Sequence, residues 1–274
     1  MVAGIIMRQT HLDPGMIIDV DLDFTNDVDG FWESFRTHDP GLLPKDGSCP
    51  DPDFKSRLLR TYHRILWSRE LPNGEFMDLG CCPRMTDYLE WKGHRFGSDS
   101  ITNSFRYPRM QHIIDQYREE FDDYRSFMEH YIRRGYTIGG MIIFPKPCKG
   151  EDGRTSQSMN QTRGCNALIK DRWDRTLECI RLHYLGKPNP LENVLHDDSW
   201  FFDKFVDFQG YVDFFFLQDF VTSDYSEVVP WLGDVCFDKP ALPQNVDEYR
   251  IWIQSNLNFV EKRNRRIASF VGSC

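Results

Sequence analysis

The stretch that decides the fold runs from Asn160 to Tyr184 and reads N-Q-T-R-G-C-N-A-L-I-K-D-R-W-D-R-T-L-E-C-I-R-L-H-Y. It opens as a polar, glycine-containing turn and continues from Ala167 to Tyr184 with the periodicity of a helix. One face of this helix is apolar and is expected to join the core: Ile169, Trp173, Leu177, Ile180 and Tyr184. The opposite face is charged and is predicted to be exposed to solvent: Asp171, Asp174, Arg175 and Glu178.

This stretch separates two halves of the chain that differ in character. Strands are predicted mainly before it, at 16–24, 75–79, 86–92, near 97–105 and at 137–144, with a long loop at 25–53 and helices at 54–68 and 110–134. After it, helices are predicted within 191–221, with a break near Gly210, and at 246–270. Because strands and helices do not alternate, we predict an α+β fold with strands mostly in the N-terminal half and a predominantly helical C-terminal half.

One compact core is expected to unite the chain. We predict a single domain over residues 1–274; the alternative is a strand-bearing part at 1–145 and a helical part at 160–274, divided in the polar loop 146–159. Hydrophobic residues make up 40% and aromatic residues 14% of the chain, which is ample material for a packed interior.

Charge and cysteine usage narrow the classes of function. The formal net charge of -9 argues against non-specific binding to duplex nucleic acid, which depends on many Lys and Arg contacts to phosphates. No apolar run approaches the length of a membrane-spanning helix, and no secretory signal is recognisable. The 8 cysteines include no C-x-x-C pair, so we expect free thiols and a cytoplasmic location.

Two residues on one flank of the 167–184 helix are candidates for catalysis. Arg172 and His183 lie about three turns apart at the border between the apolar and charged faces. An arginine at such a border can hold an anion, and a histidine can transfer a proton near neutral pH. We predict that both border one cleft; in the competing interpretation, His183 hydrogen-bonds a carbonyl and Arg172 extends to water.

The turn before this helix offers candidate ligands for an anion. Asn160 and Arg163 place an amide and a guanidinium group at the predicted helix N-terminus, where the backbone N–H groups favour negative charge. The spacing is not that of a phosphate-binding loop, and capping of the helix by Asn160 or Thr162 is the competing interpretation.

A supporting polar network is predicted where the most hydrophobic run of the chain is interrupted. Gln218 and Asp219 break the apolar segment 211–221, and polar groups in a buried helix need partners. We expect Arg172 or Arg181 to be that partner, which would make the 160–184 helix the centre of a buried network.

Acidic residues near the N-terminus suggest a weaker, metal-dependent alternative. Asp19, Asp21 and Asp23 alternate within the predicted strand 16–24 and would project from one face. The string D-L-D-F-T that begins at Asp21 resembles the D-x-D-x-T motif of haloacid-dehalogenase-type phosphotransferases. That resemblance implies that Asp21 is a nucleophile and that Mg²⁺ binds the carboxylates, although the chain lacks the βα alternation of that fold. We otherwise predict no cofactor, because no zinc-ligand spacing is present.

Several longer strings together resemble a bacterial domain-of-unknown-function family. They include T-I-G-G-M-I-I-F-P (137–145), N-Q-T-R-G-C-N (160–166), D-R-W-D-R-T-L-E-C-I-R-L-H-Y (171–184) and F-Q-G-Y-V-D-F-F-F-L-Q-D-F-V (208–221). The resemblance spans most of the chain and implies a bacterial or phage-borne intracellular protein. It carries no established activity and assigns no catalytic residue.

Two functional hypotheses follow from these patterns. In the first, the protein is an enzyme that acts on a phosphate-bearing substrate, a nucleotide or RNA, as a defence or toxin-like factor; Arg163 and Arg172 hold the anion and His183 is the acid or base. In the second, it is a non-catalytic protein that binds a ligand or a protein partner, and the same residues form a structural network.

Overall fold

The computed structural model describes residues 18–37, 50–82, 88–102, 107–148 and 155–272. Its single sheet has four antiparallel strands in the order β1 (Gly80–Cys81), β2 (Leu89–Trp91), β3 (His94–Ser100) and β4 (Met141–Pro145). The strands all lie before residue 146 and helices dominate after it, which confirms the predicted α+β class. Parts of the predicted segments 16–24, 25–53, 86–92, 97–105 and 146–159 lie outside the described residues.

A tight hairpin joins β2 to β3. Lys92 and Gly93 form its two-residue turn with φ of 52° and 80°, the conformation whose twist matches that of two antiparallel strands. The turn brings Trp91 and His94 opposite each other across the strands. β3 then pairs with β4, and every residue of β4 is buried, so β4 lies in the core. The turn between β2 and β3 is exposed at the surface.

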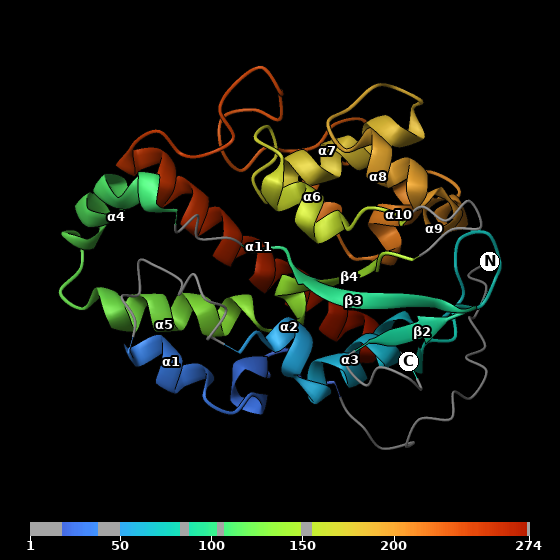
Figure 1. Ribbon diagram of the computed structural model, residues 1–274, viewed down its shortest axis with the longest axis horizontal. Helices are drawn as coiled ribbons and strands as arrows, with labels where there is room; N and C mark the ends of the chain where they lie inside the picture. The colour runs from blue at the N-terminus through green and yellow to red at the C-terminus, as the bar shows by residue number, and fades with distance from the viewer. Residues whose placement is uncertain (1–17, 38–49, 83–87, 103–106, 149–154, 273–274) are drawn as a thin grey trace.

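The helices form two groups along the chain (Figure 1). The first group comes before β4 in the chain: α1 (Phe31–Thr37), α2 (Pro52–Lys55), α3 (Arg57–Trp67), α4 (Gln111–Arg118) and α5 (Tyr124–Gly135). The other follows β4: α6 (Met159–Cys165), α7 (Trp173–Tyr184), α8 (Glu192–Asp197), α9 (Ser199–Phe202) and α10 (Phe208–Phe214). The long α11 (Val246–Gly272) runs obliquely between them, and α4 and α5 lie beside it, away from the strands. Short 3-10 turns complete the fold: η1 (Phe24–Asp27), η2 (Pro108–Met110), η3 (Ile138–Gly140), η4 (Asp203–Phe205) and η5 (Gln218–Phe220).

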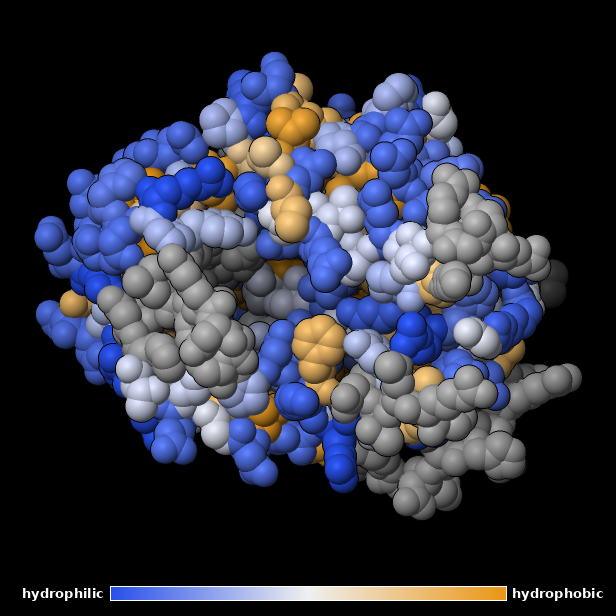
Figure 2. All heavy atoms as spheres, viewed as in Figure 1, coloured by the Kyte–Doolittle hydropathy of each residue, from blue (hydrophilic) through white to orange (hydrophobic). Residues whose placement is uncertain are grey.

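The hydrophobic core is one cluster that draws on residues from Ile18 to Ile267. It therefore includes side chains from both halves of the chain. On the face seen in Figure 2, apolar residues among those described are scattered singly, and the surface is hollowed near its centre, between the positions of α6 and α2 in Figure 1. No helix among the described residues combines the length and the apolar character that crossing a membrane requires.

Close packing of α11 on η3 depends on a glycine. The Gly139 N–H donates to the Asn264 side-chain oxygen at 2.6 Å, which links η3 to α11. A Cβ at Gly139 would lie 2.5 Å from the Val260 carbonyl oxygen, which is backbone and cannot rotate away. The glycine is thus required by the approach of α11 and not by an unusual φ.

Replacing Gly139 with alanine is expected to lower the free energy of unfolding by about 1–3 kcal/mol, the usual cost of overpacking a core. Urea denaturation followed by circular dichroism measures the change. Gly272→Ala is the matched control, since nothing lies within 4 Å of a Cβ added there. Equal stabilities of the two variants would contradict the close approach described above.

Several predicted boundaries are wrong for local reasons. The predicted helix 110–134 is two helices, because the Asp123 side chain accepts from the Ser126 N–H at 3.0 Å and starts α5 afresh. Residues 18–23 form no strand, and 75–79 contribute only an isolated bridge through Phe76. The loop predicted at 25–53 contains η1, α1 and the start of α2.

The stretch 160–184 also differs from its prediction. The residues predicted as a polar turn form α6, and the predicted helix begins at Trp173 rather than Ala167. Lys170 and Asp171 have φ of 48° and 59°, a left-handed conformation that a helix cannot continue through. The predicted break near Gly210 is also wrong, because α10 begins at Phe208, runs through Gly210 and ends at Phe214.

Candidate functional site

Arg172 immediately precedes α7 and is buried with its charge paired. Its Nε and Nη2 donate to the two carboxylate oxygens of Asp174 at 3.0 and 2.6 Å. Nη2 also donates to the Leu232 carbonyl at 2.7 Å, and Asp174 accepts the Trp231 N–H at 3.1 Å. The two side chains together therefore fix the irregular segment between η5 and α11 against the start of α7.

Arg175 extends the same anchoring. Its guanidinium donates to the carbonyl oxygens of Leu168, Lys239 and Pro240 at 2.8, 3.0 and 3.1 Å. Three of the four residues predicted to be exposed are buried, Asp174, Arg175 and Glu178, and the segment 222–245 contacts the first two; Asp171 is partly buried. That prediction is wrong because a helical wheel takes no account of irregular segments that pack over a helix.

His183 lies at the other end of α7. It lies eleven positions after Arg172, or about 16 Å along a helix. Its ring packs 5.7 Å from that of Phe202, and burial lowers its pKa while Asp203 acts in the opposite direction. The structure therefore does not bring Arg172 and His183 to one cleft.

The predicted anion ligands on α6 are engaged within the protein. Arg163 is buried and donates from Nε to the Thr176 hydroxyl at 2.9 Å, from Nη1 to the Asp99 carboxylate and from Nη2 to the Asp171 carbonyl at 3.2 Å. Asn160 donates to the Ser98 carbonyl at 3.4 Å. Asp99 thus supplies the negative charge that was predicted to come from a ligand.

The residues of the predicted supporting network bind partners other than those predicted. Arg181 pairs with Glu178, at 2.7 Å, one turn before it on α7. Asp219 accepts instead from Arg266 of α11 at 2.5 Å. Gln218 donates to Asp213 of α10 at 2.9 Å, so neither polar residue reaches an arginine of α7.

The N-terminal aspartates form local contacts rather than one carboxylate face. Asp21 pairs with Arg134 and Asp23 with Arg133, at 2.8 and 2.7 Å. Asp19 accepts the Asp21 N–H at 3.0 Å. Within the described part of the chain, no group of His, Cys, Asp and Glu side chains is arranged to hold a metal ion.

A buried polar chain that the sequence analysis did not identify links α3 to β3. Trp67 Nε1, which can only donate, gives its proton to His63 Nδ1 at 2.9 Å. The neutral His63 must then carry its own proton on Nε2 and donate it to the Ser98 hydroxyl at 3.0 Å. Burial lowers the pKa of His63 to about 3, which keeps it neutral.

The direction of this chain decides what Ser98 can do. Because His63 Nε2 donates, it cannot accept the Ser98 proton, so the pair is not a nucleophilic Ser–His dyad. Ser98 instead lies beside the Asp53 carboxyl group, whose pKa its hydroxyl lowers. Burial raises the pKa of Asp53 well above its usual value and, despite Arg163, that of Asp99 to about 6.

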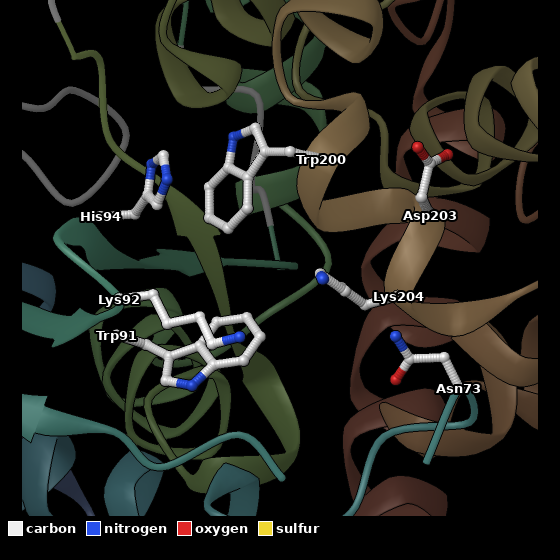
Figure 3. A pocket seen from close by; sticks show the side chains of 7 residues that line it. All are labelled: Asn73, Trp91, Lys92, His94, Trp200, Asp203 and Lys204. Carbon is white, nitrogen blue, oxygen red and sulfur yellow. The ribbon is translucent and has the colours of Figure 1, made fainter. Parts of the chain in front are cut away.

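A pocket of about 400 Å³ opens at the hairpin end of the sheet (Figure 3). Trp91, Lys92 and His94 come from the hairpin, and Asn73 comes from the turn after α3. The helical half contributes three lining residues: Trp200, Asp203 and Lys204. In Figure 3 the Lys204 side chain extends toward the space between the two indoles.

Contacts between the lining residues hold the pocket in shape. The His94 ring stacks on Trp200 at 3.7 Å between centroids, and burial lowers the His94 pKa, so it is neutral at physiological pH. Lys92 and Lys204 both pair with the Glu75 carboxylate, Lys204 at 2.8 Å. Two ammonium groups thus share one carboxylate at the rim, which leaves them capacity to bind a further anion.

The sequence contains a local signal for this pocket. W-K-G-H, residues 91–94, places a glycine in a two-residue turn between aromatic residues, which is a hairpin pattern. The contribution of Trp200 could not have been found in this way, because it lies more than 100 residues away and reaches the hairpin only through tertiary packing.

Comparison with known proteins gives one match. A protein-family sequence model, described as a family of unknown function (DUF6994), matches residues 18–267, which is nearly the whole chain. No curated protein and no solved structure matches this chain. The predicted resemblance to a domain-of-unknown-function family is therefore confirmed, and the protein belongs to the DUF6994 family.

Proposed function

We propose that the protein binds a phosphate-bearing ring compound, such as a nucleotide or the end of an RNA strand, in the pocket between Trp91 and Trp200. The observation that carries this proposal is the meeting of two indoles and two lysines, Lys92 and Lys204, around one cavity. Aromatic faces stack on bases, and ammonium groups bind phosphate. The cavity volume of about 400 Å³ falls within the range of small-molecule sites.

We further propose that the protein is an enzyme and that His183 is its acid or base. Asp203 lines the pocket, and the His183 ring packs 5.7 Å from that of the preceding residue, Phe202, which supports a role for His183 near the pocket. Arg172 has no part in this proposal, because all its contacts hold the protein together. The adjacent Cys81 and Cys82 are free thiols, which supports the cytoplasmic location that we propose.

A non-catalytic binding protein is the second candidate. It is favoured by the arginines that were predicted to bind ligand: Arg163 and Arg172 are both buried and saturated with internal partners. Under this alternative the pocket still binds its ligand, the wild-type protein shows no turnover, and His183→Gln leaves binding unchanged.

Titration with adenosine 5′-monophosphate, adenosine and inorganic phosphate tests the proposal, with intrinsic tryptophan fluorescence and calorimetry as readouts. The monophosphate is expected to bind most tightly. Lys204→Met is expected to weaken its affinity about tenfold, or about 1.4 kcal/mol, while leaving adenosine unaffected. Trp200→Leu is expected to weaken both.

Lys262→Met is the matched control, because Lys262 is an exposed lysine on α11 and lines no part of this pocket. Its affinity for the monophosphate should equal that of the wild-type protein. Saturable binding that Lys204→Met and Trp200→Leu both leave unchanged would place the ligand elsewhere and overturn the proposal.

A further inference from the structure

Lys146, directly after β4, has a side chain held in a slot that only glycine provides. It crosses β3 at Gly97, where a Cβ would overlap its Cε and lie 2.6 Å from its Nζ. Gly97 is buried in the middle of β3, a position where glycine costs stability unless another group comes close. The close group here is the lysine itself, so the path of its side chain is fixed by the strand.

Aromatic rings flank the end of this lysine. Its Nζ lies 5.1 Å from the centroid of Phe54 and 5.9 Å from that of Tyr88. Arg95 lies over the same Tyr88 ring at 5.6 Å, so a second cation borders the slot. The slot therefore removes water from the amine without offering it a direct counter-charge.

Three carboxyl groups face Lys146, but each has another partner. Asp51 accepts the Asp53 N–H at 3.0 Å, Asp53 lies beside the Ser98 hydroxyl, which lowers its pKa, and Asp99 pairs with Arg163. Within the described residues, Lys146 itself has no ion pair. Burial lowers its pKa, and the attraction of the three carboxyl groups only partly offsets this.

Asp53 completes the arrangement with an oxygen that has no partner. Its side chain is 9% exposed, and its Oδ1 makes no hydrogen bond. The chain from Trp67 through His63 ends at Ser98, beside Asp53, and supplies no partner to Oδ1, which leaves this oxygen for another molecule. An unpartnered buried oxygen is costly for a protein that has no use for it.

We propose that Lys146 and Asp53 form a second site, at which a small aldehyde or ketone condenses with the Lys146 amine while Asp53 acts as acid and base. The neutral nitrogen bonds to the carbonyl carbon, the carbonyl oxygen takes the Asp53 proton, and the nitrogen returns one proton to Asp53. The resulting hydroxyl takes that proton and leaves as water. The iminium that remains gives its N–H proton to Asp53, so one amine and one carbonyl yield one imine and one water.

Reductive alkylation of the full-length protein tests this inference without knowledge of the natural substrate. Propanal and cyanoborohydride are added at pH 7.5, and the initial rate at each lysine is measured by peptide mass spectrometry. Propanal has neither ring nor phosphate, so the result does not depend on the pocket at Trp200. Lys146 is expected to react on the order of tenfold faster than the exposed Lys187 and Lys262, as a desolvated lysine does.

The outcomes separate reactivity from simple exposure. At pH 10 the advantage of Lys146 should shrink, because the exposed lysines then lose their protons as well. Asp53→Asn should slow alkylation of Lys146 several-fold and leave Lys187 unchanged. A wild-type Lys146 that reacts no faster than Lys187 at pH 7.5 would overturn the site, and an undiminished rate in Asp53→Asn would remove the role of Asp53.

Discussion

Replacing Asp174 with alanine is expected to lower the free energy of unfolding by about 3–5 kcal/mol, the usual cost of removing one partner from a buried ion pair. Asp174 is fully buried, and the variant leaves the Arg172 charge in the interior without its carboxylate. It also removes the acceptor of the Trp231 N–H. Urea denaturation at pH 7 measures the loss.

Limited proteolysis of this variant distinguishes local from global effects. Because Arg172 and Asp174 hold the segment 222–245 on α7, cleavage in that segment should accelerate before the rest of the chain unfolds. Asp122→Ala is the control, since Asp122 is exposed between α4 and α5, and its stability should change by less than about 0.5 kcal/mol. Similar stabilities of Asp174→Ala and Asp122→Ala would mean that the contacts of Arg172 and Asp174 contribute little to the free energy of unfolding.

The fold class was predictable because it depends on patterns within short segments. The C-terminal helix was predicted at 246–270 and is observed as α11 at Val246–Gly272, and the predicted helix 54–68 contains α3. Both have long apolar stripes with a helical period. The strand 16–24 failed although its alternation was regular, because the Asp23 side chain caps η1 and no neighbouring strand pairs with residues 18–23 among those described.

The candidate site was less predictable, because charge on a helix does not reveal what covers it. Arg175 and Glu178 were assigned to solvent from the helical period of α7, yet both are buried. The covering segment 222–245 has no periodicity, so no pattern in it predicts where it packs. Its backbone carbonyls, which only the tertiary structure positions, are the groups that satisfy Arg172 and Arg175.

The pocket beside Trp200 and the slot around Lys146 could not be predicted from the sequence either, because tertiary packing forms both. Trp91 and His94 are adjacent through a turn that the sequence encodes, whereas Trp200 meets them only in the folded chain. The slot requires that Gly97 of β3 lies beside Lys146, the residue directly after β4. Residues that act together here are brought together by strand register and helix packing, which a single sequence does not display.

Arg263 is the second residue whose loss should be costly, and it shows how α11 is fastened to the sheet. Its Nε donates to the Phe215 carbonyl at 2.9 Å, and its Nη1 donates to those of Gly139 and Met141 at 2.9 and 2.7 Å. No carboxylate pairs with it among the described residues, and burial lowers its pKa to about 9, so it remains charged at pH 7.

Arg263→Met is expected to lower the free energy of unfolding by about 2–4 kcal/mol. Three buried carbonyls lose their donor, at about 1–3 kcal/mol each, and removal of a buried charge offsets part of that loss. Arg265→Met, two residues along the same helix and exposed, should change stability by less than about 0.5 kcal/mol. If Arg263→Met proves as stable as Arg265→Met, removal of the buried charge fully offsets the loss of its three hydrogen bonds, and the attachment of α11 to the sheet does not depend on Arg263.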